Sequence, residues 1–119
     1  MDTISTGKDA EDLACRYLLA RGLHLVQRNY HSRRGEIDLV MQDKDSLVFV
    51  EVRYRRQSCF GSAAESIDRR KQSKLIACAN HYLQAFPGIA GQPCRFDVVS
   101  IGGNMKRIEW IRNAFDARE

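Results

Sequence analysis

Apolar residues recur with a helical period in two parts of the chain and with a strand-like pattern in five others. The helical stripes cover residues 7–21 and about 66 to 86. The strand-like runs cover residues 23–30, 35–42, 47–55, 95–101 and 107–111. The predicted order is therefore helix, three strands, helix and two strands, which is typical of an α/β protein.

Both helical stripes end at recognisable boundary residues. Thr6 is the predicted N-cap of the first helix, and Gly22 supplies its C-terminal stop. Pro87 and Gly88 terminate the second helix, but its start stays open, because Ser62 and Glu65 could form a capping box ahead of residue 66. No internal repeat or linker-like segment interrupts the pattern, so we expect a single domain over residues 1–119.

The strands at 35–42 and 47–55 predict a hairpin whose register follows from their apolar rows. Successive side chains alternate between the two faces of a strand, and burial of both rows requires them to lie on one side of the sheet. That condition pairs Met41 with Val48, Leu39 with Val50 and Ile37 with Val52. It also leaves a two-residue turn at Lys44-Asp45, which is a favoured hairpin length.

The same register places Asp38 opposite Glu51 and Glu36 opposite Arg53. Facing Cβ atoms lie roughly 4.5–5.5 Å apart, so two opposed carboxylates repel each other. A bound cation such as Mg²⁺ would offset that repulsion, because it takes one or two carboxylates together with waters and phosphate oxygens. The alternative is a solvent-facing pair that Arg53 and Arg55 neutralise, although the hydrophobic run FVEVRYR favours a central strand covered on both faces.

The formal net charge of +4 is a mild excess, and its distribution matters more. Basic residues form three groups: Arg28, Arg33 and Arg34; Arg53, Arg55 and Arg56; and Arg69, Arg70, Lys71 and Lys74. Any one group is equally well a solvated face of the protein. Three groups around an acidic pair favour a polyanionic ligand that binds next to a metal ion. The candidate nucleic-acid contacts are Arg33, Arg34, Arg55, Arg56, Arg70, Lys71, Gln72 and Lys74. Lys71 and Gln72 continue the buried face of the second helix, so they either point at the site or face solvent.

Composition excludes several other classes of protein. With 119 residues, 44% of them hydrophobic and 29% charged, the chain is globular rather than disordered. No apolar run approaches the roughly 20 residues of a membrane span, and the N-terminus lacks the apolar core of a signal peptide. We therefore expect a cytoplasmic protein with no membrane partner. Four cysteines without a C-x-x-C pair predict reduced thiols rather than a zinc site.

Several motifs resemble a known family. Asp38, followed after a hairpin by Glu51-Val52-Arg53, resembles the PD-(D/E)xK signature of restriction-endonuclease-like nucleases. The stretches that resemble the YraN family of small bacterial, predicted endonuclease-like proteins are GEIDLV, FVEVRYR, FGSAAESIDRRKQSKL and RFDVV. The resemblance implies a single restriction-endonuclease-like domain with a central mixed sheet of about five strands flanked by two main helices. The fold is similar to that of archaeal Holliday-junction resolvases, which cut branched DNA as dimers, so a homodimer is implied as well.

The resemblance also implies roles for individual residues. Asp38 and Glu51 would hold Mg²⁺ or Mn²⁺, and Glu11 on the first helix would complete the metal shell. The chain departs from the signature where Ile37 replaces its proline and Arg53 replaces its lysine. Arginine stays protonated near neutral pH, so Arg53 is a poor general base but could stabilise charge on a phosphate.

Three functions follow from these observations. The first is a Mg²⁺-dependent endonuclease that hydrolyses DNA phosphodiester bonds, in branched or single-stranded DNA. The second is a catalytically inactive nucleic-acid-binding module on a nuclease fold, which Arg53 favours. The third is a protein-interaction adaptor with a basic surface. Asp97 and Trp110 are expected to be structural, and Glu36 either supports the site or pairs with Arg53.

Overall fold

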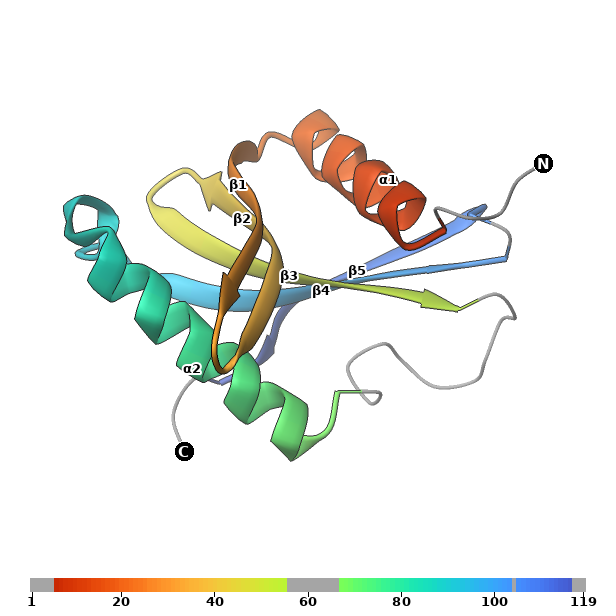
Figure 1. Ribbon diagram of the computed structural model, residues 1–119. Coiled ribbons are helices and arrows are strands. Elements are labelled where there is room, and N and C mark those ends of the chain that lie inside the picture. Colours follow the sequence, from red (N-terminus) through yellow and green to blue (C-terminus); the bar gives the residue numbers. More distant parts are fainter. Residues whose placement is uncertain (1–5, 56–66, 104, 117–119) are drawn as a thin grey trace.

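The computed structural model describes residues 6–55, 67–103 and 105–116, which form two helices, one short 3₁₀ turn and five strands (Figure 1). The helices are α1 (Thr6–Ala20) and α2 (Arg69–Ala85), and the 3₁₀ turn is η2 (Pro87–Ile89). The strands are β1 (His24–Ser32), β2 (Gly35–Asp43), β3 (Ser46–Arg55), β4 (Cys94–Gly102) and β5 (Arg107–Phe115). The predicted order of helix, three strands, helix and two strands is confirmed.

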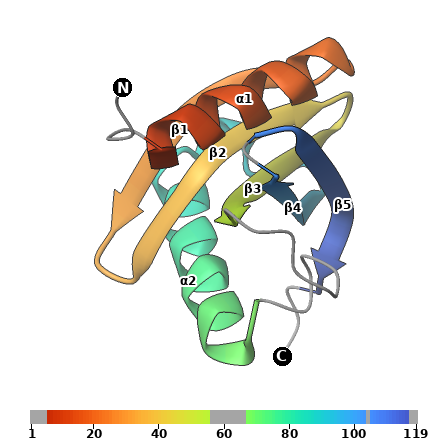
Figure 2. The same cartoon turned by 90° about the vertical axis from the view of Figure 1, so that its right-hand side faces the viewer.

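The five strands form one mixed sheet in the order β1-β2-β3-β4-β5. Strands β3 and β4 are parallel, and the other neighbours are antiparallel. A parallel pair needs a crossover connection, and α2 lies in the one that joins β3 to β4. Helix α1 covers one face of the sheet and α2 the other, as Figures 1 and 2 show. The predicted α/β fold with a five-stranded mixed sheet and two flanking helices is confirmed.

Two apolar cores lie on opposite faces of this sheet. The core under α1 joins Ala10, Ala14, Cys15 and Leu18 to Leu39, Met41, Val48, Val50, Val99 and Ile101. The core under α2 joins Leu75, Cys78, Ala79 and Tyr82 to Val40, Leu47, Phe49, Phe96 and Val98. Successive residues of β3 alternate between the two cores, so no face of this central strand is open to solvent along its first half. A charged residue that continues the strand therefore becomes buried.

The predicted hairpin register is confirmed from the turn up to Leu39–Val50, but not beyond. The register includes Met41 with Val48 and Asp43 with Ser46, which leaves the expected two-residue turn, where Lys44 has a φ of 56°. Both strands continue past Leu39–Val50, yet there β2 pairs only with β1 and β3 only with β4 among the described residues. The expected pairs of Asp38 with Glu51 and of Ile37 with Val52 are therefore absent from the ladder. We call this point of separation the fork; Figure 1 shows β2 bending away from β3 there.

Ile37 was expected on the face of Leu39 and Met41, and this expectation is wrong. It packs in the core under α2, opposite to Leu39. The pairs Arg28–Leu39 and Tyr30–Ile37 flank Asn29, whose φ of 52° is in the left-handed region. This local irregularity breaks the simple alternation of faces, which a hydrophobic pattern assumes throughout a strand.

The helix starts differ slightly from prediction. Helix α2 begins at Arg69, and its N-cap is Asp68, whose side chain accepts a hydrogen bond from the N–H of Lys71 at 2.9 Å. The alternative cap residues Ser62 and Glu65 lie outside the described residues. Thr6 is the first residue of α1 rather than the residue before it.

The cysteines fit the expectation of reduced thiols where they are described. Cys15 and Cys78 are buried, Cys94 is exposed, and all three are free. Cys59 lies outside the described residues. Neither described helix is long and apolar enough to cross a membrane.

Candidate metal centre

Asp38 lies at the fork between β2 and β3, and only 8% of its surface is exposed. Its Oδ2 accepts a hydrogen bond from the backbone N–H of Val52 at 2.8 Å. The carboxylate thus replaces the backbone carbonyl that would accept from this N–H if the β2–β3 ladder continued. Because both strands are held by their other neighbours, the fork fixes the position of this carboxylate on rigid elements.

Glu51 lies on β3 directly after the buried Val50, and 7% of its surface is exposed. By the alternation of β3 it faces the α2 side of the sheet. The ammonium Nζ of Lys71, in the first turn of α2, lies 3.4 Å from its Oε2. The first turn of α2, the helix in the β3–β4 crossover, therefore lies beside the Glu51 carboxylate of β3.

Burial controls the protonation of both carboxyl groups. Loss of solvent raises the pKa of Asp38 to about 7, and the nearby negative charge of Glu51 adds to this rise, against the lowering effect of the Val52 hydrogen bond. Burial also raises the pKa of Glu51, although the positive charges of Lys71 and Arg53 oppose that rise. The negative charge of Glu51 reaches Asp38, so the two carboxyl groups lie within electrostatic range of each other. The site is thus deficient in positive charge.

Glu11 lies on α1, on the side of the sheet opposite α2. Its negative charge contributes to the raised pKa of Asp38, so it lies within electrostatic range of the fork. Its Oε1 is 3.8 Å from Nη2 of Arg28, which also donates a 2.6 Å hydrogen bond to Asp12. Within the described ranges, no group of three His, Cys, Asp or Glu side chains is placed to hold a metal ion. The role of Glu11 as a third ligand therefore stays a prediction.

Arg53 and Glu36 do not face each other as the hairpin register implied. Arg53 is two residues after Glu51 on the same strand face, and its positive charge lowers the pKa of Glu51. Glu36 instead lies 3.1 Å from Nδ1 of His31, its partner in the β1–β2 ladder. The cause is again the fork, because β2 no longer pairs with β3 at this position.

Lys71 and Gln72 separate into two roles. Lys71 points at the site, through its contact with Glu51. Gln72 donates a 2.9 Å hydrogen bond from its Nε2 to the backbone carbonyl of Ile67, so its side chain braces the segment that leads into α2. Sequence reasoning gave both residues the same weight. What separates them is their contacts, because Lys71 reaches Glu51 on β3 whereas Gln72 reaches the backbone just before its own helix.

The remaining basic candidates form a surface beside the fork. Arg33 and Arg34 are exposed in the β1–β2 turn, and Arg70 and Lys74 are exposed on α2. The turn packs on the helix, since a Cβ on Gly35 would lie 3.5 Å from Cβ of Lys74, and Sγ of Cys78 donates to the carbonyl of Gly35 at 3.4 Å. We call these four cationic residues the hairpin–helix surface. The side chain of Arg55 and the whole of Arg56 lie outside the described residues.

Asp97 is a structural carboxylate, as expected. Its side chain is fully buried and accepts from Nε of Arg95 at 3.0 Å, from Nε1 of Trp110 at 2.9 Å and from the N–H of Asn113 at 2.9 Å. Arg95 also pairs with Asp43 at 2.9 Å. This network joins β2, β4 and β5, and it supplies the Asp97 carboxylate with one cationic and two neutral hydrogen-bond donors from the protein itself.

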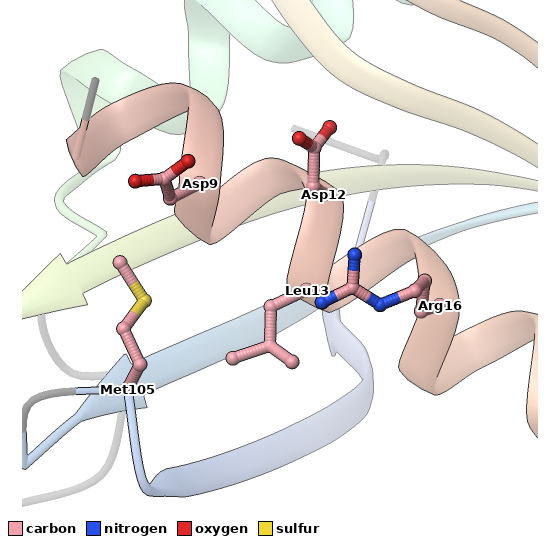
Figure 3. A pocket seen from close by; sticks show the side chains of 5 residues that line it. All are labelled: Asp9, Asp12, Leu13, Arg16 and Met105. Carbon is pink, nitrogen blue, oxygen red and sulfur yellow. The ribbon is translucent and has the colours of Figure 1, made fainter.

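A pocket of about 300 Å³ lies between α1 and the turn that joins β4 to β5 (Figure 3). Its described lining consists of Asp9, Asp12, Leu13, Arg16 and Met105. The first four project from α1 and the last from the turn between β4 and β5. Asp12 is already paired with Arg28, and the candidate carboxylates Asp38 and Glu51 are not among the described lining residues. The mixed charge of this pocket gives it no preference for a polyanion or a metal.

Comparison with known proteins places the chain in a family. Residues 10–101 match the uncharacterised protein family UPF0102. A UPF0102 protein of Nitrosococcus oceani is 59% identical over 111 residues, which are 92% of this chain and 90% of that protein. One from Stutzerimonas stutzeri is 54% identical over 115 residues, covering 95% and 96% of the two chains. Both the family match and these relatives agree with the resemblance to the YraN family, and the chain belongs to the UPF0102 (YraN) family.

Proposed function

We propose that this protein is a Mg²⁺-dependent nuclease that hydrolyses phosphodiester bonds in DNA. The observation that carries the proposal is the pair of buried carboxylates at the fork, with a pKa of about 7 at Asp38 and a raised pKa at Glu51. Buried acidic pairs of this kind are costly to a fold, and they are concentrated at functional sites. Asp97 is the internal contrast, because its charge is balanced by Arg95 and several donors.

The donor set fits a hard divalent cation. Asp38 and Glu51 offer carboxylate oxygens from adjacent rigid strands, and Mg²⁺ is commonly held by one or two carboxylates plus waters and substrate phosphate oxygens. Two ligands are therefore sufficient, whether or not Glu11 adds a third. When bound, Mg²⁺ would supply positive charge to a scissile phosphate and its attacking water.

The basic residues around the fork have complementary tasks. Arg53 is on the same strand face as Glu51 and stays protonated, so it binds phosphate oxygens and stabilises negative charge there. Lys71 neutralises Glu51 in the absence of a cation, and its side chain is 41% exposed, so it is free to turn toward a phosphate when a cation takes its place. The exposed cations of the hairpin–helix surface hold the nucleic-acid backbone beside the site.

A purely structural role for the acidic pair is harder to reconcile with these contacts. Lys71 offsets one of the two carboxylates, whereas Asp38 accepts its hydrogen bond from a neutral backbone N–H. A raised pKa at Asp38 means that ionising this group weakens the fold. A protein-interaction adaptor has no use for such a cost, whereas a cation bound between the two carboxylates would offset it.

Cleavage of labelled duplex, single-stranded and branched DNA with Mg²⁺ or Mn²⁺ tests the proposal. We expect cleavage by the wild type and its loss in Asp38→Asn and in Glu51→Gln, which keep the shape of the side chains. Asp45→Asn, in the exposed turn of the same hairpin, is the matched control and should cleave like the wild type. Undiminished cleavage in Asp38→Asn would refute the proposal. The homodimer that the resemblance implies stays a prediction.

A second candidate function is nucleic-acid binding without catalysis, and Arg53 in the lysine position of the signature is the observation that favours it. On this view DNA binding is independent of metal, no DNA substrate is cleaved, and Arg53→Lys restores activity. If the nuclease proposal is correct, the wild type already cleaves, because Lys71 supplies an ammonium group at the same carboxylate.

A further inference from the structure

Three aromatic rings, two of them exposed and one half-buried, lie at the C-terminal end of α2, away from its Lys71 end. Phe86 caps the helix and is 42% exposed. Its ring centroid is 4.7 Å from that of Tyr82 and 6.4 Å from that of Tyr30, so the ring is held from inside while part of it faces solvent. His81, also exposed, is hydrogen-bonded through Nδ1 to the hydroxyl of Tyr30 at 2.5 Å. We call Tyr30, His81 and Phe86 the aromatic platform.

The hairpin–helix surface connects this platform to the fork. Lys74 and His81 are seven residues apart on α2 and so lie on the same side of the helix, and Arg70 is one turn before Lys74. Strand β1 runs alongside, because its turn packs on Lys74 and its Tyr30 packs on His81. Figure 2 shows the β1–β2 hairpin lying beside α2. One continuous strip therefore leads from Lys71 past exposed cations to exposed rings.

We propose that this strip binds a single strand of nucleic acid, with its phosphates on the hairpin–helix surface and an unpaired base stacked on Phe86. The inference rests on the proposed function for its class of ligand, though not on catalysis. Cations that follow a backbone, together with aromatic side chains on which bases stack, are the features by which proteins bind single strands. Lys71 and the C-cap Phe86 are fifteen positions apart, or roughly 22 Å along the helix axis, which accommodates about six nucleotides at their axial spacing in a duplex strand.

The platform distinguishes a single strand from a duplex. Inside a duplex each base is stacked between its neighbours and paired, so its face is not available to Phe86. The surface cations, in contrast, meet phosphates in either form. Removal of the ring should therefore weaken only single-strand binding, and removal of a cation should weaken both.

The test is fluorescence anisotropy of labelled oligothymidine and of a labelled blunt duplex of equal length, in EDTA so that neither is cleaved. We expect Phe86→Ala to weaken oligothymidine binding about five- to a hundredfold and to leave duplex binding unchanged. Phe86→Trp should restore single-strand binding, which separates stacking from any local unfolding. Leu19→Ala, an equally exposed apolar residue on α1, is the matched control and should bind both probes like the wild type.

Salt dependence tests the cationic part of the strip. Lys74→Gln should lower the slope of log Kd against log salt by about 0.7 for oligothymidine, the value for one phosphate contact to a single strand, while Lys44→Gln in the β2–β3 turn should not. Wild-type affinity for oligothymidine in Phe86→Ala, or an equal loss on duplex, would overturn the inference. Cleavage that depends on Asp38 would still stand in that case, so failure of the strip and failure of the proposed nuclease function are distinguishable.

Discussion

Replacement of Asp38 by asparagine should stabilise the protein at alkaline pH and change its stability much less in acid. The buried carboxyl has a pKa of about 7 against an ordinary value of 3.8, so folding favours its protonated form. A raised carboxyl pKa contributes stability below the unfolded-state pKa, and this contribution is lost as pH rises toward the folded-state pKa. The asparagine side chain keeps an oxygen that can accept from the N–H of Val52 but carries no charge.

The size of the effect follows from the shift of about three pKa units. At about pH 8 the charged wild type should be less stable than Asp38→Asn by about 4 kcal/mol, and at about pH 4.5 the difference should fall to about 1 kcal/mol. Asp38 is 8% exposed, so solvent screening reduces these figures little. Asparagine differs from aspartate in polarity and hydrogen bonding at every pH, so the change between the two pH values is the informative quantity.

Urea unfolding at the two pH values measures this change directly. The fluorescence of Trp110, the only tryptophan in the chain, reports the transition, and EDTA keeps divalent cations away from the site. We expect the midpoint of Asp38→Asn to exceed that of the wild type at the higher pH and to approach it at the lower. A difference between the two proteins that is independent of pH would refute the claim that Asp38 is buried at the expense of stability.

Two further substitutions separate the candidate site from the rest of the fold. Lys71→Met should lower the free energy of unfolding by only about 1 kcal/mol in EDTA, because the lost ammonium group was 41% exposed. Mg²⁺ should then stabilise this variant more than the wild type. Thermal melts that show no larger Mg²⁺ effect in the variant would contradict the idea that the ammonium group and the cation occupy the same position beside Glu51. Asp97→Asn should lower the free energy of unfolding by about 3 kcal/mol, because Arg95 loses the more deeply buried of its two carboxylate partners. It should leave Mn²⁺ affinity unchanged, and calorimetry that finds weakened Mn²⁺ binding would contradict the structural role of Asp97.

Local patterns were sufficient to predict the elements of this fold. The alternation of Leu39 and Met41 against Val48 and Val50 fixed the hairpin register correctly near its turn, because both faces of β3 are buried and a one-residue slip would expose an apolar row. The helical stripe of α1 also identified residues that pack under it.

Features that depend on tertiary contacts were not predictable in the same way. The fork between β2 and β3 arises because β2 follows β1 while β3 follows β4, and no local pattern records which neighbour a strand keeps. Because of the fork, Ile37 packs in the core under α2 instead of the core under α1, and Glu36 pairs with His31 instead of Arg53. The contact of Lys71 with Glu51 likewise depends on where the crossover returns α2, twenty residues later in the chain.

Calorimetric titration with Mn²⁺ tests the central claim that Asp38 and Glu51 together hold one divalent cation. At about pH 8 the wild type should bind one ion per chain, and affinity should weaken toward about pH 6 as protons compete for the carboxylates. Asp38→Asn and Glu51→Gln should each abolish the binding, while Asp45→Asn should not. Equal Mn²⁺ affinity in the wild type and in both carboxylate variants would contradict the account.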